Sequence, residues 1–127
     1  MRQTALIHSP RFAEYDLGPS HPLRPIRVSR AHELMRACGL LEYDHVSLAT
    51  PSSADEETLA LIHDRDYIEA VRAPGEGRAL KRPLDYGLGT VDNPIVAGMY
   101  EAMTVVAGAS LLAADLVIDG QASVAFN

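Results

Sequence analysis

Histidine is the residue in this 127-residue chain with the widest chemical range, because it can act as a general base or ligate a metal. The chain has five histidines and one cysteine: His8, His21, His32, His45, His63 and Cys38. No two of these histidines are three or four residues apart, the spacing that places two metal ligands on one helix face. There is also no Gly-x-Ser-x-Gly turn and no phosphate-binding loop. The residues alone therefore reveal no complete catalytic or metal site.

Two segments combine histidine with charged neighbours. The segment His21–Arg27 (HPLRPIR) places a histidine and two arginines just before a predicted helix. It is either a functional group of cations or a packed loop with solvated arginines. The segment His63–Tyr67 (HDRDY) has two readings as well. Its His-Asp pair is either half of a metal site like that of HD-type phosphohydrolases or a helix junction at which an aspartate caps the next helix.

A third segment, Gly87–Pro94 (GLGTVDNP), carries Asp92 on a turn flanked by glycines. An aspartate there can accept a hydrogen bond from a ligand, or it can serve as a turn and capping carboxylate. The residue types alone leave these two interpretations equally open.

Short apolar runs and helix-terminating residues predict the elements that position these segments. The predicted strands are Ala5–Ile7, Val46–Ala49 and Ser123–Asn127. The predicted helices run from Pro25 or Ile26 to Gly39, from a capping box at Ser53–Glu56 to Ile62, over Asp66–Arg72, and from Asn93-Pro94 to Asp119. This order of strands and helices is typical of an α/β protein with a mostly parallel sheet. In the first helix the apolar residues Val28, Ala31, Met35 and Cys38 recur at steps of three and four. The last helix is apolar nearly all round, so we expect other elements to enclose this last helix.

Composition excludes several classes of function. Eleven basic against seventeen acidic residues give a net charge of -6, which disfavours a broad electrostatic contact with nucleic acid or an anionic membrane. The single cysteine cannot form an internal disulfide, and the N-terminal apolar run is too short for a signal peptide. A cytoplasmic location is therefore the expectation. The longest uncharged stretch of the second half, Ala102–Ala114, is shorter than a bilayer span.

Four segments in order resemble the N-terminal part of the zinc-dependent histone deacetylase family, most closely its bacterial acetoin utilization branch. The matching segments are Ser20–Arg27, His63–Ile68, Tyr86–Pro94 and Gly108–Asn127. The resemblance implies an α/β fold in which this chain forms the N-terminal part of a three-layer sandwich with a central, mostly parallel sheet.

The resemblance also implies an activity, the hydrolysis of an acetyl group from acetyl-lysine or a related acetylated small amine. In that family a zinc ion polarises the acetyl carbonyl, a histidine acts as general base and a tyrosine stabilises the oxyanion. These groups follow the strand that here ends at Asn127. We therefore expect residues 1–127 to be an N-terminal segment of one deacetylase domain, without the zinc ligands and inactive by itself.

Four residues can be matched to roles in the family. Asp92 matches the rim aspartate that accepts hydrogen bonds from the substrate backbone. Arg27 matches the arginine of an internal cavity associated with acetate release, and Tyr15 and Leu23 are expected to line that cavity. His63 and Asp64 match a structural segment, which counts against a metal site there. The alternative from another class is a stand-alone, non-enzymatic binding module that holds a ligand with the loop around Asp92.

Overall fold

A three-stranded parallel sheet lies at one end of the molecule in the computed structural model, which describes residues 2–127. The strands are β1 (Thr4–Ile7), β2 (Val46–Ala49) and β3 (Val124–Phe126), in the order β2-β1-β3. Leu6 of the central strand β1 pairs in register with Leu48 on one side and with Phe126 on the other. All three predicted strands are confirmed, as is the α/β fold class.

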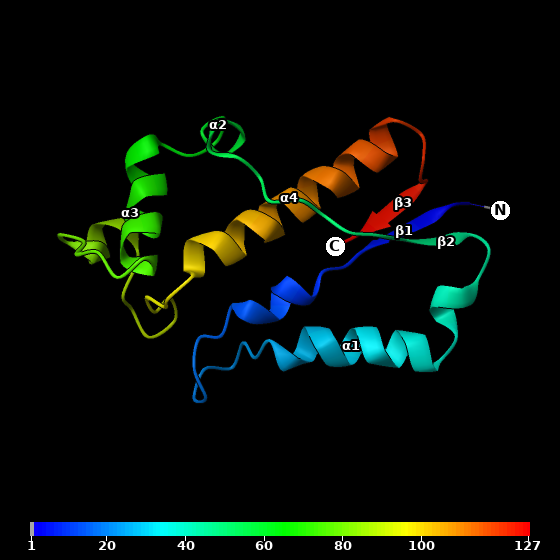
Figure 1. Cartoon of the computed structure of the whole chain (residues 1–127), viewed down its shortest axis with the longest axis horizontal. Coiled ribbons are helices and arrows are strands. Elements are labelled where there is room, and N and C mark those ends of the chain that lie inside the picture. The colour runs from blue at the N-terminus through cyan, green and yellow to red at the C-terminus, as the bar shows by residue number, and fades with distance from the viewer. Residues whose placement is uncertain (1) are drawn as a thin grey trace.

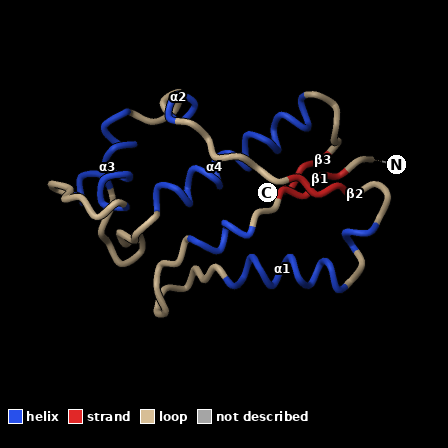
Figure 2. The backbone as a smooth tube through the Cα atoms, in the orientation of Figure 1, coloured by secondary structure: helices blue, strands red, loops and turns tan. Residues whose placement is uncertain are grey.

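Four α-helices and three short 3₁₀ helices connect the strands (Figures 1 and 2). The α-helices are α1 (Ile26–Ala37), α2 (Glu56–Leu59), α3 (Arg65–Gly75) and α4 (Met99–Ile118). The 3₁₀ helices are η1 (Pro10–Glu14), η2 (Leu40–Glu42) and η3 (Pro83–Tyr86). Figure 1 shows α1 and α4 on opposite sides of the sheet, with α2 and α3 near the end of α4 that is far from the strands.

The main core lies between α4 and one face of the sheet. Ala5 and Ile7 alternate onto that face and pack with Ala109 of α4 and with Ala122, and all four are almost completely buried. The alternation follows from the strand period of two residues, which places Leu6 on the opposite face. A second cluster, Ala70, Leu88 and Met99, joins α3 and the loop before α4 to the start of α4.

The opposite face of the sheet is covered less closely. Phe126 and Leu48, the register partners of Leu6, are 63% and 53% exposed. His32 is the buried residue of α1, whereas Val28, Ala31 and Cys38 of its predicted apolar face are exposed. This apolar face is therefore mostly exposed among the described residues, because α1 stands away from the strands and leaves a cavity between them.

Helix α4 begins later than the sequence pattern predicts. Asn93-Pro94 was the expected start, but the residue preceding the helix is Gly98, whose φ of +72° is left-handed and interrupts helical geometry. The Gly98 N–H donates to the Gly75 carbonyl (3.1 Å), so a contact with α3 sets this start. The predicted end is confirmed to within one residue, with Asp119 following the last helical residue.

Only one face of α4 is enclosed by the described residues. Its buried residues include Ala102, Val105 and Ala109, whereas Ile118 is 80% exposed. The expectation that the helix is enclosed all round is thus wrong in this structure, because a three-stranded sheet covers one side of it. By length and apolar composition alone α4 could also span a membrane, although its inner face packs on β1 and β3.

The region before α3 differs in detail from the prediction. Helix α2 ends at Leu59 rather than Ile62, and its cap is Asp55, which accepts a hydrogen bond from the Thr58 N–H at 2.8 Å. The predicted capping box at Ser53 is therefore wrong. Helix α3 is longer than predicted and includes Pro74 in its last turn.

Candidate functional site

A cavity of about 540 Å³ lies between α1 and the open face of the sheet. The cavity is lined by Tyr15, Leu23 and Arg27. Tyr15 directly follows η1, and an irregular segment separates it from the other two residues. The end of β1 contributes His8, and α1 contributes His32. The lining contains basic side chains and no aspartate or glutamate. Such a cavity suits a small anion such as a carboxylate.

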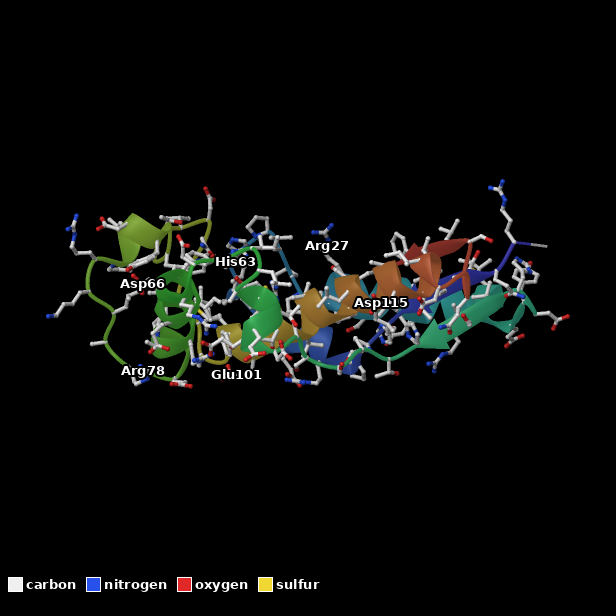
Figure 3. All side chains as sticks on the ribbon, turned by 90° about the horizontal axis from the view of Figure 1, so that it is seen from above. Arg27, His63, Asp66, Arg78, Glu101 and Asp115 are labelled. Carbon is white, nitrogen blue, oxygen red and sulfur yellow. The ribbon has the colours of Figure 1, made fainter. Side chains whose placement is uncertain are left out.

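Arg27 lines this cavity from the first turn of α1 but is largely exposed. Figure 3 shows its side chain extending outward from the ribbon. The structure thus places Arg27 at the same cavity as Tyr15 and Leu23, with the residue exposed to solvent rather than enclosed. Its role in acetate release stays a prediction.

His8 and His32 form a stacked pair in the cavity wall. Their ring centroids are 3.8 Å apart and the rings are parallel to within 2°. Burial lowers the pKa of His8, and the nearby His32 and Arg36 lower it further because they oppose a second positive charge. No motif in the sequence singles out His8 or His32 as a site residue. The available signal was the position of His8 directly after a buried strand, at the edge of a parallel sheet where ligands bind.

Tyr15 separates this cavity from a second one, of about 300 Å³, and lines both. The second cavity lies beside α3 and α4 and is lined by aromatic and apolar side chains that include Tyr67 and Tyr100. Burial raises the pKa of the Tyr15 phenol, and Tyr67 raises it slightly more. Tyr15 is therefore a neutral hydroxyl at neutral pH, able to donate and to accept a hydrogen bond.

Asp92 lies exposed on the loop before α4 and lines neither cavity. Its loop is closed by Asn93, whose side-chain amide donates to the Gly87 carbonyl (2.9 Å) and whose carbonyl accepts from the Gly89 N–H (2.9 Å). The Asp92 carbonyl is 3.3 Å from Nε2 of His21. Within residues 2–127 the Asp92 carboxylate caps no helix, since α4 begins at Met99. The helix-capping interpretation therefore finds no support within these residues, and the ligand-binding role of Asp92 stays a prediction.

The segment His63–Tyr67 forms a helix junction. Asp64 directly precedes α3, and the His63 ring lies 5.5 Å from that of Tyr67. Figure 3 shows His63 and Asp66 near α3, at the end of the molecule far from the sheet. In the part of the chain that the structure describes, no three His, Cys, Asp or Glu side chains gather as metal ligands would. A phosphohydrolase-type metal site thus finds no support here.

A parallel sheet with helices on both sides and a cavity beyond the end of its central strand defines an α/β domain of the kind that binds small ligands. The chain matches the histone deacetylase domain over residues 21–127, and it belongs to that family.

Three curated relatives show how much of the domain the chain represents. It is 39% identical to the acetoin utilization protein AcuC of Bacillus subtilis, over 100% of this chain and 33% of that protein. It is 28% identical to AcuC of Staphylococcus aureus (strain MRSA252), over 96% of this chain and 31% of that protein. It is 32% identical to histone deacetylase 8 of Danio rerio, over 99% of this chain and 32% of that protein. The chain thus spans about one third of the length of these relatives.

Proposed function

We propose that the chain is the N-terminal segment of a zinc-dependent deacetylase of the acetoin utilization type, cytoplasmic and acting on acetyl-lysine or a related acetylated small amine. In this proposal the segment supplies the substrate-binding Asp92 and one wall of the product cavity. The groups that hold the metal and transfer protons lie outside residues 1–127. Neither nucleic acid nor a membrane is a partner.

The observation that carries the proposal is the grouping of Tyr15, Leu23 and Arg27 around one basic cavity, in a chain of the deacetylase family. Hydrolysis of an acetylated amine releases acetate, and a cation without an acidic neighbour attracts that carboxylate. The Asp92 carboxylate lies exposed on a separate loop and has no partner among residues 2–127, so it fits a hydrogen bond from a substrate amide N–H.

The zinc ion of the family does not fit the residues described here. Zinc sites need three or four nitrogen, sulfur or oxygen ligands, and residues 2–127 offer no cluster of three. The stacked His8 and His32 do not make such a site, because the lone pairs of parallel rings do not converge on one point. Residues 2–127 therefore hold no metal by themselves in this proposal.

The proposal is tested by comparing the purified 127-residue chain with the full-length product of the gene. We expect the full-length product to release acetate from an acetyl-lysine peptide and to lose that activity on chelation of its metal. We expect the isolated chain to release none and to retain no stoichiometric zinc after dialysis. Zinc-dependent acetate release by the isolated chain would refute the proposed division of roles.

The alternative, a non-enzymatic binding module, gives a different result in the same experiment. A full-length product that binds the acetyl-lysine peptide in calorimetry without releasing acetate would favour the module. An open reading frame that ends after Asn127 would support the same conclusion.

A further inference from the structure

The contact between His21 and Asp92 joins two loops that are 71 residues apart in the sequence. Leu23, two residues after His21, lines the cavity between α1 and the sheet. Asn93, next to Asp92, lines the second cavity. The contact therefore ties together the walls of two cavities, beside the residue whose carboxylate is unpaired.

The hydrogen bonds of the His21 ring define its protonation state. The Leu23 N–H donates to Nδ1 at 3.1 Å, so Nδ1 carries no proton. The Asp92 carbonyl, 3.3 Å from Nε2, can only accept, so Nε2 carries the proton and donates. Both bonds are satisfied only by the neutral ring with its hydrogen on Nε2. His21 itself is half-buried, and both of its hydrogen bonds lie at the exposed surface of the molecule.

The hydrogen bonds of Thr90 and Asn93, on either side of Asp92, stay within the segment Gly87–Asn93. The Thr90 hydroxyl accepts from the Asn93 N–H (3.0 Å), and the Asn93 side chain donates to the Gly87 carbonyl (2.9 Å). These bonds close the turn but do not orient it against the rest of the molecule. The hydrogen bond from His21, by contrast, reaches Asp92 from a different loop.

We propose that His21 is a positioning residue that holds the backbone of Asp92 so that the carboxylate faces the substrate. The role of the carboxylate rests on the proposed deacetylase function, whereas the loop contact does not. Asp92 binds the substrate backbone, and His21 acts through Asp92 without touching the reacting atoms. Loss of His21 weakens substrate binding and leaves the chemical step unaffected.

The loop contact is tested in the full-length product by hydrogen exchange and by NMR of ¹⁵N-labelled histidine. We expect the His21 ring to show the Nε2–H tautomer. His21→Phe, which keeps the ring shape without donor or acceptor, should speed amide exchange at Gly89 and Asn93 several-fold while the strands remain unchanged. His21→Gln should restore protection, because its side-chain amide can donate to the same carbonyl. Unchanged exchange in His21→Phe, or an Nδ1–H tautomer in the wild type, would overturn the proposal.

The functional consequence is tested by steady-state kinetics on an acetyl-lysine peptide. Loss of one hydrogen bond that orients Asp92 should raise KM about fivefold to tenfold in His21→Phe, with kcat nearly unchanged. In an Asp92→Ala background, His21→Phe should cause no further rise in KM, since the two residues act as one unit. If His21→Phe raised KM equally in the wild type and in Asp92→Ala, positioning through Asp92 would be refuted. If no form releases acetate, the proposed function fails, and the exchange experiment alone decides the loop contact.

Discussion

Gly108 of α4 lies so close to the backbone carbonyl of Ser52 that a methyl group at Gly108 would overlap that oxygen. The segment containing Ser52 crosses α4 between β2 and α2, and the Ala54 N–H donates to the Thr104 carbonyl at 2.9 Å. Because two backbones meet here, no side-chain rotation can relieve the overlap. Glycine at position 108 is thus required by the crossing and not by a special φ angle.

We expect Gly108→Ala to lower the free energy of unfolding by about 1–3 kcal/mol, because α4 and the crossing segment must separate. In an unconstrained helix the same change would stabilise by about 1 kcal/mol. Gly75→Ala is the matched control, since its methyl group would meet the flexible Met99 side chain at 3.3 Å and the Met99 backbone nitrogen at 3.5 Å. Urea unfolding of the two variants should separate them clearly. Equal stability of the two would contradict the crossing described above.

Glu56 connects α2 to α3 through Arg72, whose guanidinium also donates to the Tyr100 hydroxyl at 2.7 Å. The hydrogen bond and the charge of Arg72 lower the pKa of Glu56 below its ordinary value of 4.5. A carboxyl whose pKa is lowered by folding stabilises the fold above pH 4.5, and this stabilisation is lost as pH falls through the pKa of the folded state.

Glu56→Gln should therefore lower the urea midpoint at pH 7 and have a smaller effect at pH 4, below the ordinary pKa of the carboxyl. Glu57→Gln is the control, because Glu57 makes no ion pair with residues 2–127 and should change little at either pH. A pH-independent deficit in Glu56→Gln would show that packing, and not the ion pair, is responsible.

Local patterns predicted the strands and α1, because a short apolar run or a proline before a helix acts over a few residues. They failed for the start of α4, which depends on a hydrogen bond between Gly98 and Gly75 that no local pattern encodes. The resemblance to deacetylases placed Tyr15 and Arg27 in one cavity, and the structure brings them together. The contact between His21 and Asp92 could not be predicted, because the two residues are 71 positions apart in the sequence.

The stacked histidines predict a dependence of stability on pH. Burial, His32 and Arg36 lower the pKa of His8 below its ordinary value of 6.5. The unfolded chain then binds a proton first as pH falls, so the stability decreases from pH 6.5 downward and levels off below the folded-state pKa.

His8→Phe keeps a stacked ring and removes the titrating group, so it should gain stability relative to the wild type between pH 7.5 and 5. Phe12→Leu is a suitable control, because it disturbs the ring packed edge-on to His8 (centroids 6.1 Å apart) without removing a titrating group. The loss of stability in Phe12→Leu should be the same at pH 7.5 and at pH 5. Thermal unfolding at fixed ionic strength measures both effects, and a constant difference between His8→Phe and the wild type would contradict the assignment.

Arg27 and Arg24 both line the basic cavity, but their guanidinium groups differ in how they are bonded. The Arg24 guanidinium donates to the Pro19 carbonyl at 3.0 Å, whereas the Arg27 guanidinium makes no hydrogen bond with the residues that the structure describes. If Arg27 binds the departing acetate, Arg27→Ala should weaken product inhibition by acetate about tenfold in the full-length enzyme, the effect of one charge-assisted hydrogen bond. Arg27→Lys should retain part of the acetate inhibition, because lysine keeps the charge but not the planar pair of donors.

Arg24→Ala is the control and should leave acetate inhibition within about twofold of the wild type, since the Arg24 guanidinium is bonded to the Pro19 carbonyl. Equal loss in the two alanine variants would assign acetate binding to the charge of the cavity as a whole and not to Arg27.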